Sequence, residues 1–143
     1  FVAGFIGSPS MNFMDCTIEE DSGQVYVNTG AFKLPLPADK AEKVRRHGGK
    51  EYVFGVRPED IRKKRTKAET FNEGHANAKV TVIEPLGKEN FVDLAAGDLQ
   101  FMAIIASNTP VETDEDIELT FNMDKTHLFE RNGDGISVIN PPK

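Results

Sequence analysis

Alternating hydrophobic and polar positions run through most of this chain and predict a series of short β-strands. The clearest case is Ile117, Leu119 and Phe121, which alternate with polar residues. In a second case, Val80 and Val82 are expected to face inward from residues 78–84. The other predicted strands cover residues 13–19, 24–28, 31–36, 52–56, 90–95, 99–106 and 136–139. About eight short strands separated by turns are typical of an all-β barrel or sandwich.

One segment, residues 37–47, has the pattern of a helix instead. Pro37 at its start suits a first helical position, and Asp39 lies near the positive end of the helix dipole. Basic residues fill its last turn, and Gly48-Gly49 follows as a helix cap. Because the apolar stripe is narrow, we expect a short surface helix on the outside of a sheet.

A continuous apolar run, Tyr52–Val56, leads into the sequence Arg57-Pro58-Glu59-Asp60. The run has the length of a buried strand, and Gly55 within it leaves room for the close approach of another group. Pro58 cannot continue the strand but can begin a helical turn. We therefore expect a buried strand that ends in a turn with Arg57, Glu59 and Asp60 at the surface.

The stretch after this turn is polar. It starts with the basic run of residues 62–67 and contains no apolar pair as far as Asn77. Such a stretch indicates an exposed loop or a connection, so the chain could form two lobes joined near residues 62–77.

Composition narrows the classes of function. Hydrophobic residues make up 38% and charged residues 28% of the 143 positions, as in an ordinary folded domain. The net charge of −6 argues against general affinity for nucleic acid. With a single cysteine, Cys16, no internal disulfide can form. No apolar run approaches the ~20 residues that span a bilayer.

Candidate catalytic and metal-binding patterns are weak. Gly48-Gly49-Lys50 lacks the earlier glycine and the following Ser or Thr of a phosphate loop. Residues 132–135 lack the spaced ligands of a calcium loop, and the acidic run 112–118 is typical of a solvated surface. The three histidines lie at His47, His75 and His127 without metal-ligand spacing, and Cys16 has no basic neighbour in sequence. We expect no catalytic residue, no metal site and no cofactor site in this chain.

Four stretches carry a family resemblance. They are residues 1–13, residues 54–61 with Arg57-Pro58-Glu59, residues 82–90 with Pro85-Leu86-Gly87, and residues 121–129. In this order they resemble the C-terminal regulatory domain of sugar-importer ATPase subunits of the maltose and multiple-sugar type. The resemblance implies an oligonucleotide/oligosaccharide-binding (OB)-like β-barrel or sandwich, also called a TOBE domain, with one short surface helix. One departure is Asp60, where the family often has His.

The resemblance also implies a division of the chain. Residues 1–12 would be the end of an upstream ATPase domain, and residues 13–143 would be the regulatory domain. The residues expected at the junction between these domains are Phe1, Phe5, Met11, Asn12 and Phe13. The bare residues fit a hydrophobic N-terminal arm docked on its own domain equally well. The chain does not begin with Met, so we expect it to be part of a longer protein.

By this resemblance the chain is a non-catalytic regulatory and dimerisation domain of an ABC carbohydrate importer. ATP and Mg would bind in the upstream domain. The expected partners are a second copy, the upstream ATPase domain, through it a membrane permease, and regulatory proteins, all at the cytoplasmic face of the cell membrane. The family motif and candidate interface residues are Arg57, Pro58, Glu59, Gly87 and Phe129. We expect Leu128 and Phe129 to be buried and His127 to be structural, although Phe129 and Phe71 are also candidates for an exposed apolar patch.

Two other functions stay open. Related barrels on molybdate-importer ATPases bind an oxyanion, which makes a small-ligand sensor an alternative. The basic run of residues 62–67, near Tyr52 and Phe71, could instead serve a single-strand nucleic-acid-binding OB module. A solvated loop explains the basic run more simply.

Overall fold

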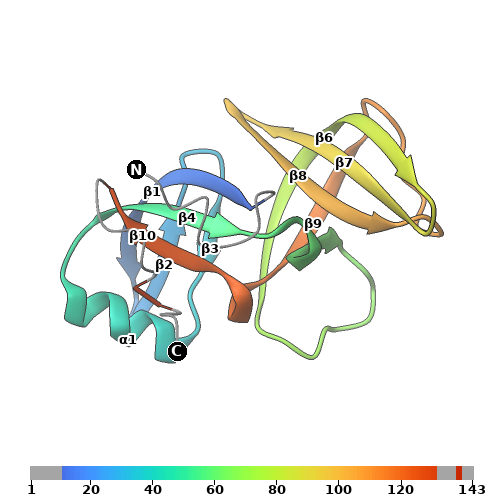
Figure 1. Ribbon diagram of the computed structural model, residues 1–143. Coiled ribbons are helices and arrows are strands. Elements are labelled where there is room, and N and C mark those ends of the chain that lie inside the picture. The colour runs from blue at the N-terminus through green and yellow to red at the C-terminus, as the bar shows by residue number, and fades with distance from the viewer. Residues whose placement is uncertain (1–10, 132–137, 140–143) are drawn as a thin grey trace.

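Two five-stranded antiparallel sheets and one α-helix make up the computed structural model, which describes residues 11–131 and 138–139 (Figure 1). The first part of the chain forms β1 (Asn12–Asp21), β2 (Gln24–Asn28), β3 (Lys33–Pro35), α1 (Ala38–His47) and β4 (Glu51–Val56). The second part forms the 3-10 turn η2 (Pro58–Asp60), β5 (Ile61–Lys63), β6 (Glu73–Leu86), β7 (Glu89–Ala96), β8 (Leu99–Ala106), β9 (Asp116–Asn122), η3 (Met123–Lys125) and β10 (His127–Glu130). The predicted all-β class with one short helix is confirmed.

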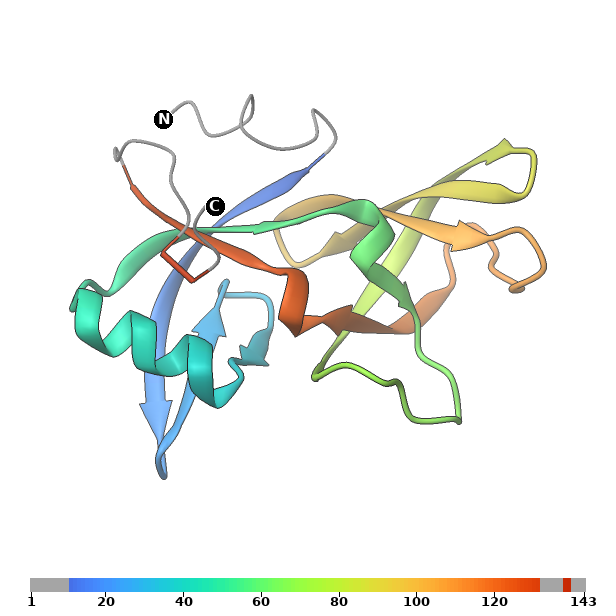
Figure 2. The same ribbon diagram turned by 60° about the horizontal axis from the view of Figure 1, so that its bottom comes forward.

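The first sheet has the strand order β10-β4-β1-β2-β3, and α1 lies along one side of it (Figures 1 and 2). Helix α1 begins after Pro37 and ends at Gly48, whose left-handed φ of 86° lets its N–H donate to the Val44 carbonyl. Only three of its side chains are buried, Lys40, Ala41 and Val44. The helix is therefore the surface element that the sequence predicts.

The second sheet has the order β5-β9-β6-β7-β8. It curls until its edge strands β5 and β8 lie close together, although no ladder joins them. Gly74, Ala76, Ala78 and Val80 form the buried side of β6. These small side chains leave room inside the curled sheet for larger residues from β7, β8 and β9.

The second sheet is an insertion within the first. The chain leaves β4 through η2, builds the whole second sheet, and returns through η3 to β10, which pairs with β4. Residues 64–72 connect β5 to β6 within the second sheet. The two lobes are thus joined at η2 and η3, and not near residues 62–77.

One hydrophobic core runs through both sheets. Phe32, between β2 and β3, packs against Phe101 of β8 and Phe121 of β9, with ring centroids 5.9 and 5.5 Å away. Leu34 of β3 reaches β6, where a Cβ added to Gly74 would lie 3.0 Å from Leu34 Cδ2. Side chains of the first sheet therefore help to fill the second.

The prediction that Val82 faces inward is wrong. Val80 is fully buried, but the pairing of β6 with β7 shifts between Val80 and Val82, and Val82 is 53% exposed. A β-bulge adds one residue to one strand and so moves the following side chains to the opposite face.

Several predicted features lie wholly or partly outside the described residues. These are Phe1, Phe5, the turn at residues 132–135 and most of the predicted strand 136–139. Of that strand, Val138 donates its N–H to the Leu128 carbonyl at 2.7 Å, and Ile139 is buried.

Candidate functional site

The turn between the sheets has the structure that its sequence predicts. Strand β4 ends at Val56, Pro58 takes the first position of η2, and the Asp60 N–H donates to the Arg57 carbonyl at 2.9 Å. Pro58 is buried and Glu59 is exposed, while Arg57 and Asp60 are half-buried. Burial, and then the neighbouring Glu59 carboxylate, raise the pKa of Asp60 above its ordinary value of 3.8.

Gly55 makes room for Phe129 beside this turn. A Cβ on Gly55 would lie 2.9 Å from Phe129 Cε2 and 3.0 Å from Met11 Sδ. Phe129 is only 3% exposed, so its predicted burial is confirmed, and the alternative that it is an exposed contact residue is wrong. The exposed ring in this region is Phe13, which is 36% exposed and lies 6.0 Å from the Phe129 ring.

His127 and Arg57 form a partly buried basic pair next to Gly55. Among the described residues, His127 Nδ1 and Arg57 Nε are buried without a hydrogen-bond partner. Burial, and then the charges of Arg57 and Lys40, lower the pKa of His127 from 6.5. These surroundings favour the uncharged imidazole, which suits the structural role predicted for it.

Asn12 joins the two sheets directly. Its side-chain Nδ2 donates to the Met102 carbonyl at 2.8 Å, and the Met102 N–H donates to Asn12 Oδ1 at 2.9 Å. An amide side chain thus takes the place of a neighbouring strand at the edge of β8. Nothing in the sequence signals this pairing, because the two residues are far apart in the chain.

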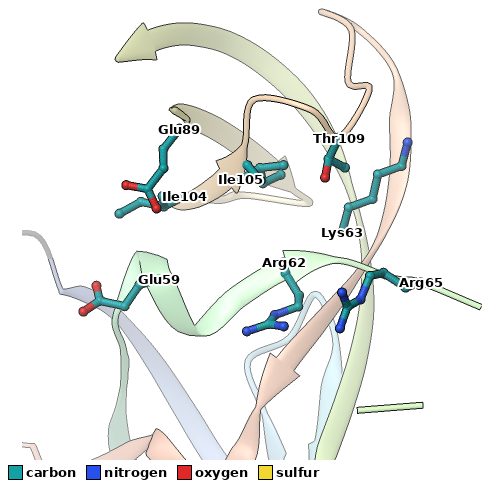
Figure 3. A pocket seen from close by; sticks show the side chains of 9 residues that line it. Glu59, Arg62, Lys63, Arg65, Glu89, Ile104, Ile105 and Thr109 are labelled. Carbon is teal, nitrogen blue, oxygen red and sulfur yellow. The ribbon is translucent and has the colours of Figure 1, made fainter. Parts of the chain in front are cut away.

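A pocket of about 230 Å³ lies between the turn and β8 (Figure 3). It is lined by Glu59, Arg62, Lys63, Arg65, Glu89, Ile104, Ile105, Ala106 and Thr109. In Figure 3 the guanidinium groups of Arg62 and Arg65 point away from Ile104 and Ile105, whereas Lys63 extends toward Thr109. Six polar or charged residues and three apolar residues therefore line the pocket, with Ile104 and Ile105 on the side away from the guanidinium groups.

The basic side chains of residues 62–65 form ion pairs or hydrogen bonds with other groups of the chain. Arg62 and Arg65 both contact the Glu69 carboxylate, at 3.2 and 2.9 Å, and the Glu69 side chain is only 5% exposed. Lys63 donates to the Pro110 carbonyl at 2.7 Å, and Lys64 lies 3.5 Å from Glu118. These contacts favour a solvated, internally neutralised loop over a site for nucleic acid or an oxyanion.

Three other candidates have surroundings that suit structural roles. Phe71 is half-buried beneath the Arg62 guanidinium, 5.3 Å from its ring centroid. Gly87 has a φ of 80° in the turn between β6 and β7, which favours glycine there. Burial raises the pKa of the Cys16 thiol to about 12, so it is not a reactive thiolate. Within residues 11–131 and 138–139, no cluster of acidic, His and Cys side chains could hold a metal ion, and no helix is long and apolar enough to cross a membrane.

Two family models match consecutive parts of the chain. The MalK OB fold domain matches residues 7–61, and the TOBE domain matches residues 54–129. The chain belongs to the TOBE domain family. The two matches overlap at residues 54–61, where the structure passes from the first sheet to the second. This TOBE chain therefore carries the Arg57-Pro58-Glu59 segment of its family resemblance at the junction of its two sheets.

Relatives of this TOBE chain include ATP-binding proteins of sugar importers. It is 37% identical over 134 residues to the trehalose/maltose import ATP-binding protein MalK of Thermococcus litoralis, covering 92% of the chain and 35% of that protein. It is 38% identical to the multiple sugar-binding transport ATP-binding protein MsmK of Streptococcus mutans, covering 91% of the chain and 34% of that protein. The chain thus spans about a third of the length of these relatives.

A solved structure shares the fold at low sequence identity. The cytoplasmic molybdate-binding protein ModG, with molybdate bound, superposes with a TM-score of 0.62 at 15% identity, covering 83% of this chain and 95% of that one. At this identity the likeness concerns the fold alone.

Proposed function

We propose that this chain is the non-catalytic regulatory and dimerisation domain of the ATP-hydrolysing subunit of an ABC carbohydrate importer. The observation that carries the proposal is the tandem match to the MalK OB fold and TOBE domains, in a chain whose relatives are sugar importer ATP-binding proteins. The sequence contains no phosphate loop, so catalysis would belong to another part of the parent protein, which would bind ATP and Mg.

In the proposed parent protein, an ATPase domain precedes this regulatory domain. Met11 and Asn12 are part of the regulatory domain, because Asn12 begins β1, Met11 packs with Val53 and Phe129, and the MalK OB fold domain matches from residue 7. The partners of the regulatory domain are the upstream ATPase domain, a membrane permease reached through that domain, and regulatory proteins, at the cytoplasmic face of the membrane. A second copy holds two subunits together while their ATPase domains open and close. Such a permanent contact makes each reclosure effectively intramolecular.

Phe13 is the candidate contact residue for self-association. It stands 36% exposed at the start of β1, beside the Arg57-Pro58-Glu59 turn and on the buried Phe129 ring. Exposed aromatic rings supported by a rigid sheet are typical anchors of protein interfaces.

Sedimentation velocity over a range of concentrations tests this proposal. We expect a concentration-dependent dimer that Phe13→Ser weakens by about tenfold or more, as for loss of an interface anchor. Val82→Ser is the matched control, because Val82 is an exposed side chain of the other sheet. A wild-type chain that stays strictly monomeric at the highest concentration contradicts self-association by this domain.

A further inference from the structure

The outer face of β6, β7 and β8 carries an unusual number of exposed apolar side chains. After the bulge at Val80, the even-numbered residues of β6 point outward, and Val82 and Leu86 are 53% and 50% exposed. Phe91 of β7 and Ile104 of β8 pair with each other, lie on the same face and are half-buried. We call this surface the β6–β8 face. Large exposed apolar side chains that cluster on one sheet mark an interaction surface.

Three carboxylates stand among these apolar side chains. The register places Glu84 opposite Phe91, Asp93 opposite Val82, and Glu89 opposite Leu86. In the described part of the chain none of these three carboxylates forms an ion pair. The face therefore combines apolar side chains with three carboxylates that have no ion-pair partner among the described residues.

None of the nearby basic side chains forms an ion pair with these carboxylates within residues 11–131 and 138–139. Lys79 lies on the outer side of β6 opposite Ala95, and Lys88 lies in the turn between β6 and β7. Across the pocket, Arg62 and Arg65 are bound to Glu69 and point away from Ile104 (Figure 3). Lys63 donates to the Pro110 carbonyl and lies 3.9 Å from Glu115.

The pocket continues the β6–β8 face at the β8 edge. Glu89 and Ile104 lie together on its upper side in Figure 3, and Ile105 lies beside them. Its volume of about 230 Å³ is below the ~300 Å³ at which small-molecule sites begin, but it could receive one large side chain. Anchor side chains of protein interfaces usually insert into such a pocket beside an apolar surface.

We propose that the β6–β8 face docks a basic amphipathic α-helix of a protein partner, with apolar side chains on Phe91 and Ile104 and lysines or arginines on Glu84, Glu89 and Asp93. Five residues of β6, 82–86, extend about 17 Å at ~3.4 Å per residue, which corresponds to roughly three helical turns. Two strand spacings give a width of about 10 Å, close to the diameter of a helix. The face thus has the dimensions of a short helix as well as its complementary charge.

Other occupants fit the surface less well. A second copy would place carboxylates against carboxylates, and an anionic membrane or a nucleic acid would be repelled. An added β-strand would have to pair with β8, where the Asn12 side chain already occupies the Met102 backbone. This docking site goes beyond the proposed self-association through Phe13 and does not depend on it.

Binding of a synthetic peptide to the intact chain tests the proposal. The probe is a fluorescent leucine–lysine peptide of about 14 residues, roughly four helical turns, with leucines on one face. We expect saturable anisotropy binding at about 0.15 M salt. Glu84→Lys and Glu89→Lys should each weaken the affinity for this peptide about fivefold or more, because each replaces an attraction to the peptide lysines by a repulsion.

Two control variants distinguish binding at the β6–β8 face from a general effect of the net charge of the chain. Asp21→Lys reverses an exposed carboxylate of the first sheet and should change the affinity less than about twofold. Leu86→Ser should weaken binding while leaving the thermal midpoint unchanged, because Leu86 is half exposed.

The proposal is overturned by any of three results. The first is the absence of saturable peptide binding, and the second is equal weakening of that binding by Asp21→Lys and Glu84→Lys. The third is an affinity for the peptide that Leu86→Ser leaves unchanged. A wild-type dimer that Leu86→Ser dissociates in sedimentation would assign the face to a second copy instead, and this outcome is separate from the effect of Phe13→Ser.

Discussion

At the scale of single residues, Gly55 lets two side chains from distant parts of the chain pack closely against β4. A glycine inside the apolar run Tyr52–Val56 predicts a close approach, and Gly55 has one. The groups that approach are Phe129 and Met11, which come from opposite ends of the described chain. Their identity depends on strand order, because β1 and β10 flank β4, and no local pattern encodes that order.

His127, next to Gly55, should make folding stability depend on pH. Its pKa in the folded chain lies below 6.5 because of burial, Arg57 and Lys40. Between that lowered pKa and 6.5 the unfolded chain binds more protons, so stability is lost as the pH falls through this window. We expect His127→Phe, which keeps a ring beside Phe129, to reduce the loss. Urea unfolding at about pH 7.5 and about pH 5 measures this loss of folding stability.

His75 provides the control for this prediction. It is exposed on β6, and its Nδ1 lies 3.4 Å from the Thr120 hydroxyl. His75→Phe removes an exposed imidazole from the other sheet and is the comparison variant for His127→Phe. If His127→Phe and wild type lose equal stability between the two pH values, the imidazole of His127 is not the group responsible.

At the scale of elements, the sequence predicts the bounds of two strands but misses the start of a third. Strands β2 and β8 have the bounds that the sequence predicts, Gln24–Asn28 and Leu99–Ala106. Strand β6 begins at Glu73, earlier than predicted, because its buried positions there are Gly74 and Ala76. Small residues carry little hydrophobic signal, yet the close approach of Met123 and Leu34 leaves no room for a larger side chain at Gly74.

The edge of β8 depends on a side chain that no strand pattern reveals. Asn12→Ala removes both hydrogen bonds to Met102 and leaves its N–H without that acceptor. We expect a loss of about 1 kcal/mol in stability. Amide hydrogen exchange should show faster exchange at Met102, while amides within the β7–β8 ladder keep their protection.

Gln24→Ala is the matched control for Asn12→Ala. The Gln24 side-chain amide also donates to backbone carbonyls, those of Val25 and Leu36, but within the first sheet. Its removal should leave the Met102 amide protected. Unchanged exchange of Met102 in Asn12→Ala would show that the Asn12 amide does not hold the β8 edge.

At the scale of the whole molecule, the two sheets are topologically and physically one unit. The second sheet is inserted between β4 and β10, so the first sheet is complete only after the second has been built. The sequence predicts an all-β fold and raises the idea of two lobes, but it places their connection in the polar stretch 62–77. That polar stretch lies within the second sheet, where Arg62 and Arg65 pair with Glu69. The segments that join the two sheets, η2 and η3, are short and partly buried.

Phe32 should couple the unfolding of the two sheets. Its ring touches Phe101 and Phe121 of the second sheet from a position between β2 and β3. The chain has no Trp and two tyrosines, Tyr26 and Tyr52, both in the first sheet, so tyrosine fluorescence reports that sheet alone. In the wild type we expect the fluorescence and far-ultraviolet circular dichroism transitions to coincide, as for a two-state domain.

Replacing Phe32 with alanine should both destabilise the chain and separate the fluorescence transition from the circular dichroism transition. Phe32→Ala should cost roughly 2–4 kcal/mol, somewhat less than a fully buried Phe. With the bridge removed, the two sheets can melt independently, so the tyrosine signal and circular dichroism should give different midpoints. Phe71→Ala is the control, because its half-buried ring packs under Arg62 and should leave the transitions coincident. Coincident transitions in Phe32→Ala would mean that contacts at η2, η3 and Asn12 are enough to make the two sheets unfold as one.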